Sequence, residues 1–312
     1  MYDPAKLAKE VEEVVCSGDR RRYYRFRPAR FYGGISTADC VGCCLRCVFC
    51  WSFREVANPH KFGSMYSPEE VASKLVSMAK RKGFRQMRVS GNEPTIGREH
   101  LIKVLELIPA QYLFILETNG ILVGSDPSYA DELSRFPNLH VRVSLKGASE
   151  EEFSRLTGAV PEGFELQLNA LENLRRHGVR THAACMVSFS NEESVRSLRR
   201  RLGSIDPEFE DFEVEELILY PSVEARLQKS GVSYFTAHMP DRVPLAMNPA
   251  SEAFELELAQ CSHLSIWRSS LMKSARRRMT PCNRLEILRG CIVMNPPRQD
   301  MVLGIRSETS LP

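Results

Sequence analysis

Several features are missing from this 312-residue sequence, and each absence narrows the class of protein. No apolar run is long enough to cross a bilayer, so we expect no membrane partner. The first residues, MYDPAKLAKEVEEVV, are charged and lack the apolar core of a secretory signal, which predicts a cytoplasmic location. The net charge of +3 is close to neutral for this length and does not by itself require a nucleic-acid partner.

Cysteine, in contrast, is abundant and strongly clustered. Ten cysteines in a chain that we expect to stay in a reducing compartment favour metal or redox chemistry over disulfides. Five of them lie in the run CVGCCLRCVFCWS, at residues 40–52. Pairs separated by two residues also occur in structural zinc sites, although such sites usually draw their pairs from separate segments. A non-catalytic zinc or iron–sulfur protein is therefore the alternative to an enzyme.

Two sets of cysteines in this run have the spacing of an iron–sulfur loop. Cys43, Cys47 and Cys50 are separated by three and then two residues, so one short loop can ligate three irons of a 4Fe–4S cluster. Cys40, Cys44 and Cys47 have the same spacing. The spacing alone leaves both registers open.

From residue 31 to residue 221, predicted strands alternate with predicted helices. The strands are predicted at residues 31–37, 84–90, 111–118, 139–147, 181–189 and 213–221. The helix at 67–83 shows the usual boundary signals, with Ser67 as N-cap, Glu70 at the capping-box position and Gly83 as stop. This alternation predicts an α/β protein of parallel βαβ units, and six units make a partial (β/α)6 barrel of the TIM type.

We expect three regions in the chain. They are an N-terminal helix with a basic and aromatic extension (1–30), the partial barrel (31–221) and a mainly helical C-terminal extension (222–312). The extension GDRRRYYRFRPAR interleaves arginine with aromatic residues, as nucleic-acid-binding surfaces do, but we favour an edge strand or a segment packed on the barrel. In the C-terminal region, the spacing of Cys261, Cys282 and Cys291 favours free buried thiols over an auxiliary cluster.

Polar residues follow the predicted strands, at the edge where barrels of this type carry function. The second strand ends in Ser90-Gly91-Asn92-Glu93-Pro94, the third in Thr118-Asn119-Gly120 and the fourth in Ser144-Leu145-Lys146, and His182 opens the fifth. In the cysteine run, Gly42 and Arg46 flank the first part and Phe49 precedes Cys50. This ordered series resembles the radical S-adenosylmethionine (SAM) superfamily, and within it the glycyl-radical (pyruvate formate-lyase) activating enzymes.

The resemblance implies two cofactors and a set of residues that hold them. A 4Fe–4S cluster would be bound by Cys43, Cys47 and Cys50. SAM would be bound by strand-end residues, namely Ser90, Gly91, Asn92, Glu93, Pro94, Thr118, Asn119, Ser144, Lys146 and His182. Within that set, Glu93 would contact the methionine ammonium and Lys146 the carboxylate. The sequence departs from the activating enzymes where Asn92 replaces a glycine, Ser144 replaces an aspartate, and Tyr220 stands where they tend to have a histidine.

The resemblance also implies a reaction. An electron donor such as ferredoxin or flavodoxin would reduce the cluster, SAM would be cleaved, and the resulting 5′-deoxyadenosyl radical would abstract hydrogen from a substrate under anaerobic conditions. A protein or peptide is the substrate implied by the activating enzymes. RNA is the alternative, because Cys50-Trp51 resembles the pair in wybutosine-forming tRNA enzymes and the basic segments could hold phosphates.

Overall fold

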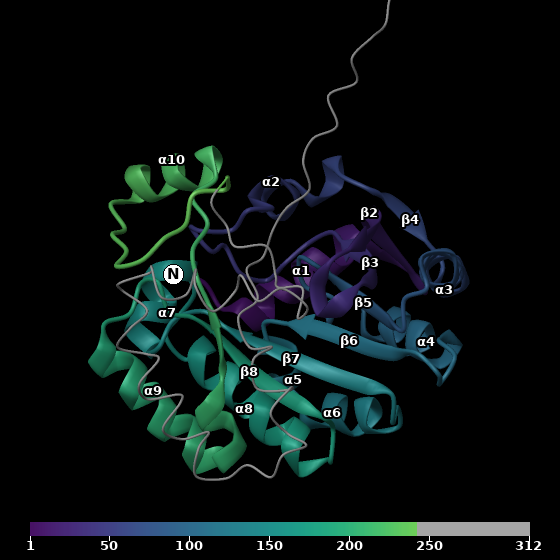
Figure 1. Ribbon diagram of the computed structural model, residues 1–312. Coiled ribbons are helices and arrows are strands. Elements are labelled where there is room, and N and C mark those ends of the chain that lie inside the picture. The colour runs from purple at the N-terminus through teal and green to yellow at the C-terminus, as the bar shows by residue number, and fades with distance from the viewer. Residues whose placement is uncertain (242–312) are drawn as a thin grey trace, which may run out of the picture.

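The computed structural model of the protein describes residues 1–241 and is built on one mixed β-sheet (Figure 1). The strand order is β1-β2-β3-β5-β6-β7-β8-β9, with β4 beside β2. The strands are β1 (Cys16–Ser17), β2 (Arg20–Ala29), β3 (Ile35–Cys40), β4 (Ser64–Tyr66), β5 (Gln86–Gly91), β6 (Leu113–Thr118), β7 (Leu139–Leu145), β8 (Thr181–Met186) and β9 (Glu213–Glu215). The six strands β3 and β5 to β9 are parallel, which confirms the predicted α/β fold.

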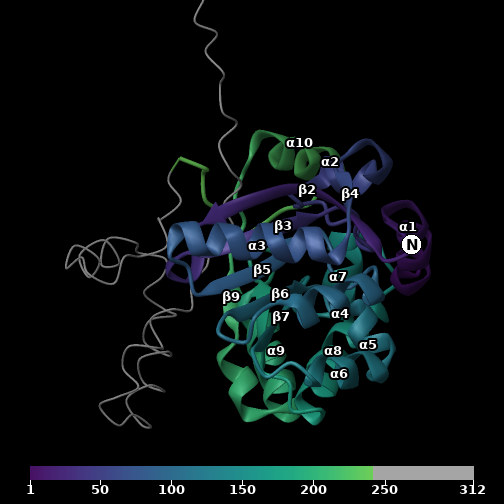
Figure 2. The same cartoon turned by 90° about the vertical axis from the view of Figure 1, so that its right-hand side faces the viewer.

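Helices connect the parallel strands and cover the outer side of the curved sheet (Figures 1 and 2). They are α1 (Pro4–Val15), α2 (Phe53–Ala57), α3 (Pro68–Lys82), α4 (Arg98–Leu107), α5 (Ile121–Ser125), α6 (Pro127–Ser134), α7 (Glu150–Thr157), α8 (Gly163–Arg176), α9 (Glu192–Ile205) and α10 (Pro221–Ser230). Within the described residues β9 pairs only with β8, so the sheet stays open there as a partial barrel. No helix among residues 1–241 is long and apolar enough to span a membrane.

The two faces of the sheet differ in chemistry because successive side chains of a strand alternate between them. On β5, Met87 and Val89 point outward into the apolar core that the helices cover. Arg88, between them, points inward, where its guanidinium meets the carboxylate of Glu117 at 2.7 Å. The inner face therefore carries buried charges, and the outer face supplies most of the hydrophobic stabilisation.

The limits of the first and the sixth predicted strand differ most from those in the structure. The first was predicted at residues 31–37, but Phe31–Gly33 forms a 3-10 turn and the strand begins at Ile35. Gly34 lies between them with φ 119°, a conformation that side chains disfavour and that ends the turn. The sixth was predicted to extend to residue 221, but β9 ends at Glu215, and Pro221 is the first residue of α10.

The basic and aromatic extension forms β2, which pairs antiparallel with β3 and so lengthens the sheet at its edge. Arg21 and Tyr23 are buried, and Arg20 pairs with Glu70 at 3.0 Å. The arginines of β2 thus have partners within the protein. The C-terminal cysteines Cys261, Cys282 and Cys291, the basic run 273–279 and the rest of residues 242–312 lie outside the described residues.

Candidate functional site

A cleft with a cavity volume of about 120 Å³ opens at the carboxyl ends of the parallel strands. Its walls come from the cysteine loop between β3 and α2, from the ends of β5, β6 and β7, and from the segment after β9. Distant parts of the chain therefore meet at one place, as expected when parallel strands end at the same edge.

Most of the predicted site residues line this cleft. Those that do are Cys43, Cys47, Cys50, Ser90, Gly91, Asn92, Glu93, Thr118, Asn119, Ser144 and Lys146. Two predicted residues do not line it, namely Pro94 and His182. The cleft thus brings together the cysteine loop and three of the strand-end motifs.

The side chains of the cysteine loop separate into two groups. Cys43, Cys47 and Cys50 line the cleft, whereas Cys40 and Cys44 are fully buried outside it. Cys44 accepts a hydrogen bond from the amide of Asn119 at 3.3 Å. Of the two registers that the spacing left open, only Cys43, Cys47 and Cys50 thus present all three thiols to the cleft.

The thiols of the cleft differ in their electrostatic surroundings. Burial raises the pKa of the Cys47 and Cys50 thiols, since a buried site disfavours the thiolate. A hydrogen bond with Cys44 lowers the pKa of Cys43 despite its burial. Without a bound cation, most thiols of this loop are expected to remain protonated. A bound metal group would favour their thiolate forms.

Contacts from distant segments fix the shape of the cysteine loop. The guanidinium of Arg226 in α10 donates to the carbonyls of Val48 (3.1 Å) and Cys50, and it lies over the ring of Phe53. α10 and α2 accordingly lie side by side in both Figures 1 and 2. Within the cysteine loop itself, Arg46 donates to the carbonyl of Cys43 at 2.6 Å.

Asn92 connects the loop after β5 to both ends of the cysteine loop. Its side-chain oxygen accepts from the amide of Gly42 at 2.8 Å, and its nitrogen donates to the hydroxyl of Ser52 at 2.9 Å. A glycine here could make neither bond. Gly91, in contrast, must be glycine, because a Cβ atom would lie 2.9 Å from the backbone of Asp39 and its φ is 99°.

The carboxylate of Glu93 is buried and completely hydrogen-bonded by the protein. One oxygen accepts from the backbone and hydroxyl of Thr95 and from the hydroxyl of Thr118, and the other accepts from the backbone of Asn119, all within 3.0 Å. The side chain, only 1% exposed, therefore holds the end of β6 against the loop after β5. Its backbone carbonyl accepts from Arg21 at 2.7 Å.

Opposite the cysteines, Lys146 carries a positive charge into the cleft. Its ammonium donates to the hydroxyl of Ser144 at 2.5 Å and lies 3.9 Å from the carboxylate of Glu215. Arg142 bonds the same carboxylate at 2.6 Å. Although burial opposes ionisation, these two cations lower the pKa of Glu215 to about 2.

His182 lies at the amino end of β8, away from the cleft, and its side chain is one-third exposed. Its ring is 2.6 Å from that of His140 and 3.0 Å from the carboxylate of Glu213. The structure therefore places this predicted residue within an inner-face network that continues to Arg142, which bonds Glu213 at 2.8 Å.

Sequence reasoning missed several charged residues that line the cleft. They are Glu117, Arg142, Glu215 and Glu216. Each lies in or directly after a predicted strand. For Arg142 the available signal was its place between Val141 and Val143 in a predicted strand, because alternation directs such a residue to the inner face.

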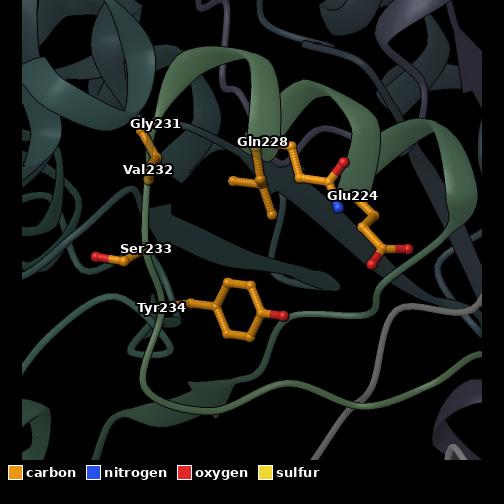
Figure 3. Close-up of a pocket in the computed structure, with 7 residues that line it drawn as sticks. Glu224, Gln228, Gly231, Val232, Ser233 and Tyr234 are labelled. Carbon is orange, nitrogen blue, oxygen red and sulfur yellow. The ribbon is translucent and has the colours of Figure 1, made fainter.

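A second cavity, of about 240 Å³, lies beside α10 (Figure 3). In this cavity the ring of Tyr234 faces Glu224 and Gln228 of the helix. None of its lining residues is a cysteine or belongs to a strand-end motif. It is separate from the cleft.

Comparison with known families gives a match to the family described as the Radical SAM superfamily, over residues 39–202. This span contains the cysteine loop and β5 to β8. It covers just over half of the chain.

Curated relatives match part of the same region. A GTP 3′,8-cyclase of Syntrophomonas wolfei subsp. wolfei is 31% identical over 168 residues, which cover 53% of this chain and 49% of that protein. A GTP 3′,8-cyclase of Petrotoga mobilis is 31% identical over 142 residues, 42% of each chain. The chain spans about half the length of the curated relatives it matches. These relatives are consistent with membership of the radical SAM superfamily. Their name does not single out glycyl-radical activating enzymes.

Among solved structures, SuiB of Streptococcus suis bound to precursor peptide SuiA has a TM-score of 0.48 and 15% sequence identity. The alignment covers 65% of this chain and 47% of that chain.

Proposed function

The chain belongs to the radical SAM superfamily, and from that membership we propose that it cleaves SAM reductively to abstract hydrogen from a protein or peptide substrate. It is an enzyme, and its cofactors are the 4Fe–4S cluster and SAM of that superfamily. When bound, this pair supplies a 5′-deoxyadenosyl radical from the one-electron cleavage of the sulfur–carbon bond. The residues that hold the cofactors and the substrate class are our proposal.

One observation carries the assignment of the cluster ligands. Cys43, Cys47 and Cys50 are the cysteines of the loop that line the cleft, and soft thiolates in this number suit three irons of a cubane cluster. The residues present therefore fit the group. Hydrogen bonds from Arg226 and Arg46 to the loop carbonyls would hold the three thiols in place for it.

The other wall of the cleft supplies groups suited to the amino-acid end of SAM. Lys146 would pair with the carboxylate, because its ammonium extends into the cleft beside Ser144. Glu93 would act mainly as a positioning residue, since its carboxylate already accepts four hydrogen bonds from the protein. The ammonium of SAM would then be met by backbone carbonyls of the same loop.

Apolar side chains shield part of the cleft from water. Met186, Leu217 and Ile218 line it on the side of β8 and β9, and each is at least nine-tenths buried. A radical that meets water or solvent hydrogen donors is lost, so exclusion of solvent is part of the function. The protein also needs a reductant, and we propose a ferredoxin or flavodoxin in a cytoplasmic setting.

The substrate class that we propose rests on the Ser144-Leu145-Lys146 segment and on Leu156-Thr157-Gly158, which resemble the activating enzymes. A nucleotide is the second candidate, because the curated relatives are named GTP 3′,8-cyclase. RNA has less support from the described residues, since the arginines of β2 bond to other parts of the protein.

The test of the cofactor assignment is anaerobic reconstitution followed by two measurements. Bound iron and sulfide would be determined, and 5′-deoxyadenosine would be measured after addition of SAM and dithionite. Cys43→Ala, Cys47→Ala and Cys50→Ala should each abolish 5′-deoxyadenosine formation. Cys40→Ala and Cys44→Ala are the matched controls from the same loop and should retain it.

Two results would contradict this assignment. No dithionite-dependent 5′-deoxyadenosine from the intact protein would remove the enzyme proposal altogether. Loss of iron in Cys40→Ala and Cys44→Ala, with retention in Cys43→Ala and Cys50→Ala, would instead move the cluster to the other register.

The substrate proposal is tested by stimulation of the same reaction. A peptide, GTP and a transfer RNA would be added in turn, and 5′-deoxyadenosine would be measured for each. Stimulation by the peptide supports a protein or peptide substrate. Stimulation by GTP alone would show that the substrate is a nucleotide. RNA binding that does not weaken as salt rises would count against phosphate contacts and the RNA alternative.

A further inference from the structure

A compact group of polar side chains lies on the inner face of β2 and β3, beside the cleft. We call it the Asp39 cluster, and its members are Tyr24, Arg25, Arg27, Thr37 and Asp39. Asp39 is fully buried, and one of its carboxylate oxygens accepts from Arg25 Nε at 2.6 Å and from Arg27 Nε at 2.9 Å. Two arginines and one carboxylate leave the cluster with a net charge of about +1 at neutral pH.

The cluster is incompletely hydrogen-bonded. Four of its polar atoms are buried and have no partner among the described residues: the second oxygen of Asp39, the hydroxyls of Thr37 and Tyr24, and Nη2 of Arg25. Only seven such atoms occur in the whole described part of the chain. Each one costs free energy, so four in one cluster indicate that a group outside the described residues completes them.

Two contacts connect the cluster to the cleft. Asp39 and Ser90 are paired in register on β3 and β5, so their side chains share the inner face, and Ser90 lines the cleft. The guanidinium of Arg25 lies 5.6 Å from the ring centroid of Trp51, which also lines the cleft. The cluster therefore adjoins the wall of the cleft at Ser90 and Trp51, and a ligand that extends past Trp51 would lie beside it, although its own side chains do not line the cleft.

The unpartnered atoms restrict the chemistry of that ligand. The free oxygen of Asp39 only accepts a hydrogen bond, and Nη2 of Arg25 only donates one. A carboxylate or phosphate would be repelled by Asp39, and an ammonium by Arg25. A neutral planar group with an N–H donor beside a carbonyl acceptor satisfies both atoms at once, and it can stack on the flat surface of Trp51.

We propose that the Asp39 cluster is a substrate subsite that binds such an amide edge. The inference rests on the proposed function, because it assigns the cluster to the substrate of the same cleft. Two sources present this edge: the lactam of a guanine or uracil base, and the primary carboxamide of an Asn or Gln side chain in a peptide. A trans peptide bond does not, because its N–H and C=O point in opposite directions.

Binding to the reconstituted protein, measured by calorimetry, tests the subsite with two pairs of probes. GTP is compared with ATP, whose base presents the donor and acceptor in inverted order. The peptide Ac-Gly-Asn-Gly-NHMe is compared with Ac-Gly-Asp-Gly-NHMe, in which a carboxylate replaces the carboxamide. We expect one amide-bearing probe to bind at least tenfold more tightly than its partner.

Variants then locate the binding. Asp39→Asn should weaken the preferred probe at least tenfold, because its amide nitrogen would face the N–H of the ligand. Thr37→Val keeps all the charges of the cluster and should weaken binding severalfold, which covers the case in which Asp39→Asn fails to fold. Glu172→Gln, in an exposed pair on α8, is the control and should bind like the unmodified protein.

The outcomes separate this inference from the proposed function. Preference for GTP or for the Asn peptide, lost in Asp39→Asn, supports the subsite and identifies its source. The inference is overturned if the unmodified protein shows no preference between the paired probes. It is also overturned if Asp39→Asn and Thr37→Val show the same preference as the unmodified protein. Either result leaves water as the partner of the four atoms. Failure of the proposed function would appear differently, as an intact protein that makes no 5′-deoxyadenosine.

Discussion

Two charged clusters on the inner face of the sheet differ in how completely their hydrogen bonds are made. The Arg142 cluster comprises Arg142, Ser144, Lys146, Glu213 and Glu215. Each carboxylate oxygen in it has a partner: Arg142 reaches both oxygens of Glu213 and one of Glu215, and Ser144 donates to the other at 3.0 Å. In the Asp39 cluster, one carboxylate oxygen and three further atoms have no partner among residues 1–241.

This difference separates a structural role from a recognition role. The Arg142 cluster has no carboxylate oxygen left to offer a ligand, and its function is to set the position and charge of Lys146, the member that extends into the cleft. An unsaturated cluster costs stability in the absence of a ligand and recovers it on binding. The comparison can be tested by removing members of each cluster, beginning with the change of largest effect.

Arg142→Met should destabilise the protein by about 3–5 kcal/mol, because it leaves two buried carboxylates without their cation. Denaturant unfolding at pH 7 measures the loss. Arg176→Met, which breaks an exposed pair with Glu172, should cost less than about 0.5 kcal/mol. A loss below about 1 kcal/mol for Arg142→Met would mean that the cluster is hydrated and not a structural element.

The Arg142 cluster is connected to His140 through His182, which contacts both His140 and Glu213. His140 makes the stability of the protein depend on pH. Burial, with the neighbouring His182 and Arg180, lowers the pKa of His140 to about 4. Below its ordinary value of about 6.5, the unfolded chain binds a proton that the folded protein does not. Stability contributed by neutral His140 is therefore present above pH 6.5 and is lost as the pH falls toward 4.

His140→Gln tests this dependence. The loss of stability between pH 7 and pH 5 should be smaller in the variant by about 1–2 kcal/mol, since one pKa unit corresponds to about 1.4 kcal/mol. Denaturant midpoints at the two pH values provide the measurement. Equal losses in the two proteins would show that His140 is solvated enough to titrate normally.

Asp39→Asn should lower the free energy of unfolding by about 1–2 kcal/mol. This is less than the loss expected for Arg142→Met, although both changes break buried ion pairs. The side chains of Arg25 and Arg27 are 20% and 15% exposed, so water can partly replace the lost carboxylate, whereas Glu213 and Glu215 are almost inaccessible. Unfolding of the two variants under the same conditions gives the order. The reverse order would assign the structural role to the Asp39 cluster.

The sequence predicted the cleft better than it predicted these clusters. The cysteine loop and the motifs at Ser90, Thr118 and Ser144 each follow a strand, so alternation of strands and helices suffices to bring them to one edge. Arg142 and Glu213 are 71 residues apart, and their contact depends on the register of three strands, which no local pattern encodes. β2 was ambiguous because arginines alternating with aromatics suit a solvated edge as well as a binding surface.

Thr37→Val should have the smallest effect on stability and decides most directly between the two roles. The substitution replaces a buried hydroxyl without a partner by a methyl group of nearly the same size. Removing an unsatisfied polar atom should leave the free protein unchanged or stabilise it by up to about 1 kcal/mol. If the cluster recognises substrate, the same variant must bind the preferred probe more weakly, so stability and affinity move in opposite directions. If a water already satisfies the hydroxyl, the variant should instead lose about 1 kcal/mol with no change in affinity, and the two clusters would then be alike.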